Sequence, residues 1–92
     1  MDKKELFVLA SYVKISSYRY AVLTVLSETD VMIPTQIASA SDILINHISK
    51  VLSELKDKDL VVCLNEDARK GRLYCLTDKG KDVMSIIKKG VV

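Results

Sequence analysis

The stretch from Ser41 to Leu60 constrains the fold more than any other part of the chain. Its apolar residues recur at intervals of three and four, the spacing of a helix with one buried face. That face consists of Leu44, Ile48, Val51, Leu52 and Leu55. Ser41 and Asp42 are favourable N-cap residues, so we expect the helix to start at 42 or 43 and to end near 58. The opposite face carries short or hydrogen-bonding side chains, namely Asn46, Ser49, Lys50, Ser53 and Glu54.

Length and composition limit the class of protein. Ninety-two residues, of which 49% are hydrophobic and 28% charged, suit one globular domain and not a disordered chain. The net charge of +2 permits nucleic-acid binding without indicating it. No apolar run approaches the roughly 20 residues that span a bilayer, so we expect no membrane partner. The N-terminal segment is better interpreted as an amphipathic helix than as a signal peptide.

Chemically reactive residues are few. Cys63 and Cys75 are too few for a disulfide scaffold, and they lack the spacing of metal ligands. Strand alternation places them on opposite faces, so we expect free thiols in a cytoplasmic protein. The sequence has no glycine-rich phosphate loop, no paired carboxylates in an apolar setting and no Cys–His neighbourhood. We therefore predict that the protein is not an enzyme and uses no cofactor or metal, with His47 a surface or groove residue.

Periodicity and turn residues predict the other elements. Helices are expected over 3–14, 18–27, about 34–39 and 78–89, with a strand-like run at 31–33 and strands over 60–64 and 72–76. The polar loop 65–71 joins the two strands into a hairpin. Ser16 or Ser17 should cap the second helix and Thr77 the last one. The second helix should bury Tyr18, Val22, Val25 and Leu26. The fold class is α+β, mostly α, in a single domain over 1–92.

Several segments match a known pattern in their order and spacing. They are Ile37-Ala38, Ile43, Ile48-Ser49-Lys50-Val51-Leu52 (similar to V-S-R-x-L), Leu55 to Val61 (L-x-x-K-G-L-V) and Tyr74 to Gly80 (Y-x-L-T-x-x-G). Over about residues 18–88 the chain therefore resembles winged helix-turn-helix transcriptional regulators of the MarR/ArsR type. Asp42 and Asp59 stand where that family commonly has glycine.

The resemblance implies a winged helix-turn-helix with a two-stranded wing and additional N- and C-terminal helices. It also implies sequence-specific binding of double-stranded DNA, with the helix over about 43–58 in the major groove and the wing 65–72 on the backbone or minor groove. The implied DNA-binding residues are Thr35, Gln36, Ile45, Asn46, His47, Ser49, Lys50, Ser53, Arg69, Lys70 and Arg72. Their chemistry agrees, because Asn pairs with adenine and basic side chains contact phosphates.

The terminal segments contain more apolar residues than a winged core needs. We expect the terminal helices, 1–15 and 78–92, to hold a homodimer, because large exposed apolar patches mark interfaces. The predicted interface residues are Leu6, Phe7, Leu9, Ala10, Val13, Val83, Ile86 and Ile87. A monomer whose first helix folds back over its own wing is the other possibility. An alternative function is a protein–protein interaction module without DNA binding, favoured by the low net charge and by Leu44 and Ile45. The sequence does not identify a small-molecule effector.

Overall fold

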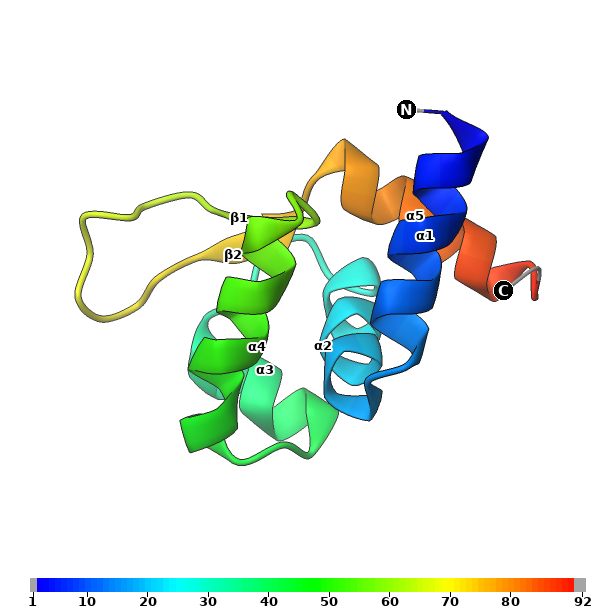
Figure 1. Ribbon diagram of the computed structural model, residues 1–92. Helices are drawn as coiled ribbons and strands as arrows, with labels where there is room; N and C mark the ends of the chain where they lie inside the picture. Colours follow the sequence, from blue (N-terminus) through cyan, green and yellow to red (C-terminus); the bar gives the residue numbers. More distant parts are fainter. Residues whose placement is uncertain (1, 91–92) are drawn as a thin grey trace.

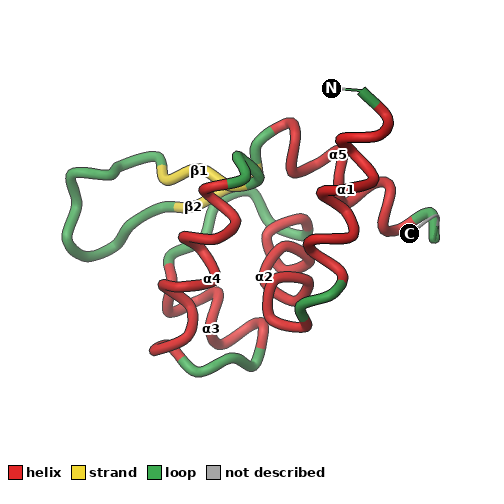
Figure 2. Tube along the Cα trace, in the orientation of Figure 1, coloured by secondary structure: helices red, strands yellow, loops and turns green. Residues whose placement is uncertain are grey.

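The computed structural model describes residues 2–90, and within them it contains five helices and one two-stranded antiparallel sheet. The helices are α1 (Lys3–Lys14), α2 (Ser17–Ser27), α3 (Pro34–Ser41), α4 (Ile45–Asp57) and α5 (Asp78–Lys88), and the strands are β1 (Val61–Cys63) and β2 (Tyr74–Leu76). Figure 1 shows α1 lying against α2 and α5, while the loop between β1 and β2 projects away from the helices. Helix dominates the trace (Figure 2), and the predicted fold class is confirmed.

Three helices start at side-chain caps. Asp2 accepts a hydrogen bond from the Glu5 amide at 2.8 Å, and Ser16 accepts one from the Arg19 amide at 3.2 Å. Thr77 Oγ1 accepts from the Gly80 amide at 2.9 Å. Each bond satisfies one of the amides that a helix leaves without a partner in its first turn. The predicted caps at Ser16 and Thr77 are confirmed.

The predicted start of α4 is wrong. Ser41 ends α3 and donates its hydroxyl to the Ile37 carbonyl at 2.6 Å, so it does not cap the next helix. Asp42 adopts a left-handed conformation with φ 58°, and the Ile43 amide closes the turn on the Ala38 carbonyl at 3.1 Å. Helix α4 therefore begins at Ile45, after Leu44 at the N-cap. Leu44 is 71% exposed and does not belong to the buried face, whereas Ile43 is buried.

The end of α4 repeats this turn. Asp59 has φ 60°, and the Leu60 amide donates to the Leu55 carbonyl at 3.0 Å. A bond to the carbonyl five positions back across a left-handed residue is the Schellman ending of a helix. Glycine is usual at the left-handed position, and aspartate is one of the few other residues that adopts it routinely. Asp42 and Asp59 thus form left-handed turns at the two positions where the resemblance leads us to expect glycine.

The core lies between the helices and the inner face of the sheet. Its α4 members are Ile48, Val51, Leu52 and Leu55, as predicted apart from Leu44. In α2 the buried residues are Val22, Leu23 and Leu26. Tyr18 is instead 43% exposed and Val25 is only half-buried, so these two predictions are wrong. Helix α2 crosses the core with a face rotated slightly from the predicted one.

Helices α1 and α5 close over the same core. Their buried residues include Leu9, Ala10, Val13, Val83 and Ile87. All five were predicted to contact a second chain, but their own chain already covers them. These residues are buried because α1 packs along α5 and α2. The contact joins segments far apart in the sequence, so periodicity alone does not reveal it. Leu6, Phe7 and Ile86 are half-buried and remain partly accessible.

The hairpin pairs Val61 with Leu76, Val62 with Cys75 and Cys63 with Tyr74. Its regular strands are shorter than predicted, although the Leu64 amide still donates to the Leu73 carbonyl at 2.8 Å. The predicted strand-like run at 31–33 does not form a strand. It contributes only one antiparallel bridge, between Met32 and Tyr74. Cys63 is buried and Cys75 is partly exposed on the other face, both as free thiols.

The junction between α4, the hairpin and α5 is built from backbone contacts. Thr77 Oγ1 donates to the Asp59 carbonyl at 2.6 Å, and the Thr77 amide donates to the Leu60 carbonyl at 3.1 Å. A Cβ atom on Gly80 would lie 2.1 Å from that same Leu60 oxygen. Thr and Gly in the Y-x-L-T-x-x-G segment therefore dock the first turn of α5 against the end of α4. None of the helices within residues 2–90 combines the length and apolar character needed to cross a membrane.

Candidate nucleic-acid interface

Helix α4 exposes one polar ridge. The ridge consists of Asn46, Ser49, Lys50 and Ser53, all solvent-exposed. Their spacing of three, four and seven places them on one side of a helix, opposite the four buried residues of α4. The ridge is therefore held in place by the core behind it, and its side chains point away from the protein.

A groove separates this ridge from the hairpin. It has a volume of about 370 Å³, and its lining includes Ser49, Ser53, Lys56, Arg69 and Arg72. The structure thus places Ser49 and Ser53 of α4 beside Arg69 and Arg72 of the hairpin loop. The sequence analysis had assigned all four to one DNA-binding site. Lys56 is an addition that the sequence analysis did not include. Its position one turn beyond Leu52 on the groove side becomes evident only once the hairpin is placed.

Side-chain hydrogen bonds shape residues 64–73, the wing loop. Arg72 donates through Nε to the Ala68 carbonyl at 2.8 Å and through Nη2 to the Glu66 carbonyl at 2.9 Å. Asn65 Oδ1 accepts from the Leu73 amide at 2.7 Å, and its Nδ2 donates to the Gly71 carbonyl at 3.2 Å. Gly71, with φ 66°, makes the turn that an L side chain would strain. Arg72, which the sequence predicts to contact DNA, also braces the loop, and Asn65 is a second brace.

The charged side chains of the wing loop differ in whether another residue of the chain already pairs with them. Lys56 of α4 and Glu66 of the wing loop form an ion pair. The hydrogen bond with Lys56 lowers the pKa of Glu66, and the same bond raises the pKa of Lys56. Arg69 and Lys70 at the tip are exposed and form no hydrogen bond or ion pair with any other residue in the described chain. These two side chains are the free cations of the loop.

The other flank of α4 faces the start of α2. His47 and Lys50 line a hollow of about 300 Å³ together with Tyr18 and Arg19. The Tyr18 and His47 rings lie 5.5 Å apart. Both the tyrosine and the arginine were missed as neighbours of the site, because no local pattern links α2 to a helix some 30 residues later. His47 is an exposed groove residue, as predicted.

Arg19 ties three helices together beneath this flank. Its Nε donates to the Tyr12 carbonyl at 2.9 Å, and its guanidinium lies 3.9 Å from the centre of the Tyr12 ring. Nη1 lies 3.5 Å from Glu54 Oε1. Arg19 thus fixes α4 against α1 and α2, and it is too well bound within the chain to serve as a surface cation.

The remaining predicted residues lie at helix starts. Thr35 and Gln36 are exposed in the first turn of α3, where Gln36 Oε1 accepts from the Ile33 amide at 3.1 Å. The Gln36 side chain is therefore engaged in capping, while the Thr35 hydroxyl stays accessible. Ile45, the first residue of α4, is 50% exposed.

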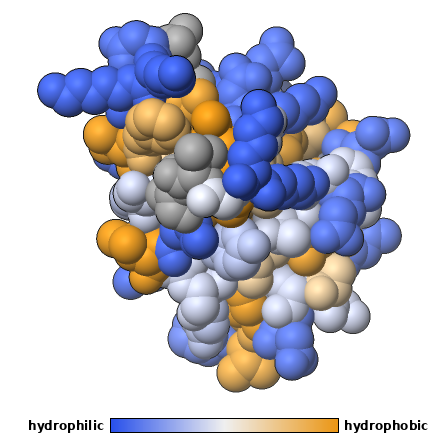
Figure 3. Space-filling model, turned by 90° about the vertical axis from the view of Figure 1, so that its right-hand side faces the viewer, coloured by the Kyte–Doolittle hydropathy of each residue, from blue (hydrophilic) through white to orange (hydrophobic). Residues whose placement is uncertain are grey.

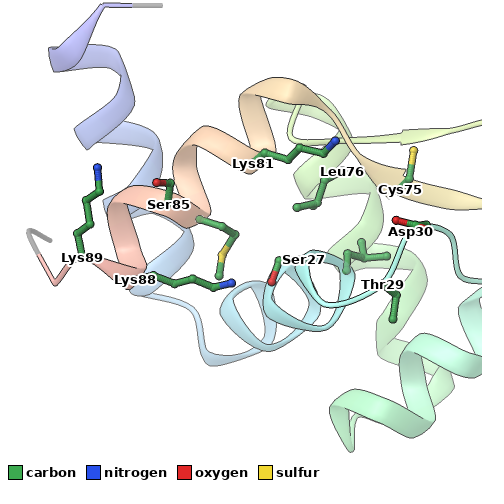
Figure 4. A pocket seen from close by; sticks show the side chains of 11 residues that line it. Ser27, Thr29, Asp30, Cys75, Leu76, Lys81, Ser85, Lys88 and Lys89 are labelled. Atoms are coloured by element: carbon green, nitrogen blue, oxygen red, sulfur yellow. The ribbon is translucent and has the colours of Figure 1, made fainter.

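A third hollow lies away from this surface. It has a volume of about 550 Å³ between the end of α2, residues 29–30, β2 and α5 (Figure 4). Lys81, Lys88 and Lys89 stand around an apolar lining that includes Leu76 and Met84. It shares no residue with α4 or the wing loop. Over residues 2–90 the His, Cys, Asp and Glu side chains form no cluster that could hold a metal ion.

The winged helix-turn-helix family model matches residues 19–90, which is most of the chain and includes the surface just described except Tyr18 at the start of α2. The chain belongs to the winged helix-turn-helix family. The architecture agrees, since α3 and α4 are the two helices of the motif and the hairpin is its wing. A comparison with curated proteins gives no match.

Solved structures share this winged helix-turn-helix fold. A MarR family transcriptional regulator from Silicibacter pomeroyi has a TM-score of 0.74 at 22% identity, covering 85% of this chain and 51% of that one. NadR in complex with 4-hydroxyphenylacetate has a TM-score of 0.73 at 20% identity, covering 94% and 62%. A mutant of ZitR from Lactococcus lactis has a TM-score of 0.69 at 25% identity, covering 80% and 51%. The chain thus spans 51–62% of the length of these proteins, and the predicted likeness to MarR-type regulators is confirmed at the level of the fold.

Proposed function

We propose that this winged helix-turn-helix protein is a sequence-specific, DNA-binding transcriptional regulator that works in the cytoplasm. Helix α4 enters the major groove and the wing loop follows the phosphate backbone into the minor groove. The observation that carries the proposal is the polar ridge of α4, which faces away from the core and is continued across a groove by Arg69 and Arg72. A rigid helix with a hydrogen-bonding outer face and a basic loop beside it fits a duplex.

The side chains differ in their proposed roles. Asn46 reads a base, because its amide can pair with both N6 and N7 of adenine. Lys50, Arg69 and Lys70 contact phosphates, which positions the helix without selecting a sequence. Ser49, Ser53, His47 and the Thr35 hydroxyl supply further hydrogen bonds at the edges of the contact. Arg72 acts indirectly by holding the wing loop in shape.

We further propose that the protein acts as a homodimer, now with a smaller set of contact residues. Besides the half-buried Leu6, Phe7 and Ile86, the candidates are Val8 on α1 and Ile15 at its C-cap, which are 61% and 80% exposed. The α1–α5 end of the molecule displays hydrophobic side chains in separate patches among hydrophilic ones (Figure 3). A two-fold dimer would place two α4 helices about one DNA turn apart, roughly 34 Å. Light scattering at tens of micromolar should give the mass of two chains, and the mass of one chain would reject the dimer.

The alternative proposal is a protein-interaction module. It is favoured by the outer face of the hairpin, where Val62, Leu64 and Leu73 are 37%, 56% and 37% exposed. The net charge of +2 is also low for a nucleic-acid-binding chain. The two functions differ in their dependence on salt, because displacement of counterions makes DNA binding fall steeply as salt rises.

The test is binding to a mixed-sequence duplex about 30 base pairs long, measured by fluorescence anisotropy over a range of salt concentrations. Lys50→Ala and Arg69→Ala should each weaken binding and reduce the slope of log K against log salt by about 1. Lys81→Ala also removes one positive charge, but from α5, outside the proposed DNA-binding surface. It is the matched control. Asn46→Ala should relax sequence preference at a cost of about 1–3 kcal/mol. Unchanged binding in all three interface variants, with intact circular dichroism, would reject the proposed surface.

A further inference from the structure

The start of α4 carries two apolar side chains that the core does not cover. Leu44 is 71% exposed and Ile45 is 50% exposed. Leu44 is also the N-cap residue of α4 and makes no side-chain hydrogen bond to the helix. Leucine is a poor N-cap, whereas Ser, Asp or Asn would accept a hydrogen bond from the first turn. A residue that neither burial nor local structure favours marks a position with another role.

These two residues come just before the polar ridge along the chain. Leu44 and Ile45 come directly before Asn46, the first residue of the ridge, in the part of a recognition helix that contacts base edges. The major groove offers one large apolar group, the C5-methyl of thymine, and apolar side chains contact it there. The paired adenine offers N6 and N7 to an asparagine. An A·T pair, or two adjacent ones, therefore presents partners for all three side chains.

We propose that Leu44 and Ile45 contact thymine C5-methyl groups beside an adenine bound by Asn46, so that the protein selects A·T pairs at this point of its site. The inference rests on the proposed function and specifies what the start of α4 recognises. It also gives a DNA-binding role to Leu44 and a specific contact to Ile45, the two residues that had favoured a protein partner. The exposed Val62 lies in β1, outside both α4 and the wing loop, and takes no part.

The test compares two mixed-sequence duplexes that differ only in carrying thymine or deoxyuridine, which lacks the C5-methyl group. The wild-type protein should bind the thymine duplex about fourfold more tightly for each methyl group contacted, the factor that corresponds to burying one such group. In the double variant Leu44→Ala with Ile45→Ala this difference should disappear. Val62→Ala removes an exposed apolar side chain from β1, outside the wing loop, and it should keep the difference.

A second variant separates recognition from folding. Leu44→Ser supplies an N-cap acceptor, so it should raise the melting temperature while lowering the preference for the thymine duplex. Equal wild-type affinities for both duplexes, with a steep salt slope retained, would overturn the methyl contact and leave the proposed function intact. A preference that survives in the double variant would overturn it as well. Failure to bind either duplex at low salt would reject the proposed function, and this inference with it.

Discussion

Gly80→Ala tests how α5 is docked onto the rest of the domain. An alanine Cβ would lie 2.1 Å from the Leu60 carbonyl oxygen, far closer than such atoms approach, so either α5 or the Leu60 backbone must move. The same carbonyl accepts from the Thr77 amide at 3.1 Å, and Thr77 caps α5. A shift large enough to admit the methyl group weakens both interactions. The substitution therefore acts on the junction and not on the helix alone.

The expected net loss is about 2–4 kcal/mol in the free energy of unfolding. Overpacking costs about 1–3 kcal/mol, and the damaged hydrogen bond and cap cost about 1 kcal/mol each. The better helix propensity of alanine returns about 1 kcal/mol. Urea unfolding followed by circular dichroism measures the net value, and the melting temperature should fall by about 4–8 °C per kcal/mol.

The matched control is Ser85→Ala, an exposed position on the same helix. It should change the free energy of unfolding by no more than about 0.5 kcal/mol. Helix propensity taken alone predicts the opposite sign for Gly80→Ala, a gain of about 1 kcal/mol. A Gly80→Ala variant as stable as the wild type, or more stable, would refute the close backbone contact.

Three further predictions concern the turns and the wing loop. Asp59→Gly should raise the free energy of unfolding by about 0.5–1 kcal/mol in urea titrations, because it relieves a left-handed residue, while Asp57→Gly at the last residue of α4 should lower it by about 0.3 kcal/mol. Glu66→Gln should strengthen duplex binding by releasing Lys56, whereas the distant Asp82→Asn should have a smaller effect, and equal effects would contradict a special role for this pair. Because the pKa of Glu66 is lowered, its ion pair stabilises the loop above the ordinary glutamate pKa and is lost as pH falls through the lowered pKa. An NMR titration of the Glu66 carboxyl should show its midpoint rising in Lys56→Ala, and an unchanged midpoint would contradict the pairing.

Features that depend on interactions within a few residues could be predicted from the sequence. The buried face of α4 follows from periodicity, because Ile48, Val51, Leu52 and Leu55 recur at helical spacing whatever they pack against. The caps at Ser16 and Thr77 were also predictable, since each bonds an amide three residues away. The start of α4 was not, because Ser41 and Asp42 are equally suitable for ending α3.

Contacts between residues that are far apart in the sequence could not be predicted from local patterns. The braces Asn65 and Arg72 act on residues whose positions are fixed only by the closed wing loop. Arg19 meets Glu54 across 35 positions, and no spacing rule connects them. The terminal helices were assigned to a dimer because their apolar faces were visible in the sequence, but their mutual packing was not. Leu44 was predicted to be buried because α4 was expected to start at 42 or 43. The helix starts at Ile45, which leaves Leu44 at the exposed N-cap.

The central claim is that α4 and the wing loop form one DNA-binding surface. Its most direct test is an amide NMR titration of the labelled protein with a short mixed-sequence duplex at low salt. If α4 and the wing loop bind DNA together, the largest shifts fall on Asn46 to Ser53 and on Arg69 and Lys70, while the amides around Ser85 on α5 stay unchanged. Shifts confined to α5 and the outer face of the hairpin, or no shifts at any DNA concentration, would contradict it.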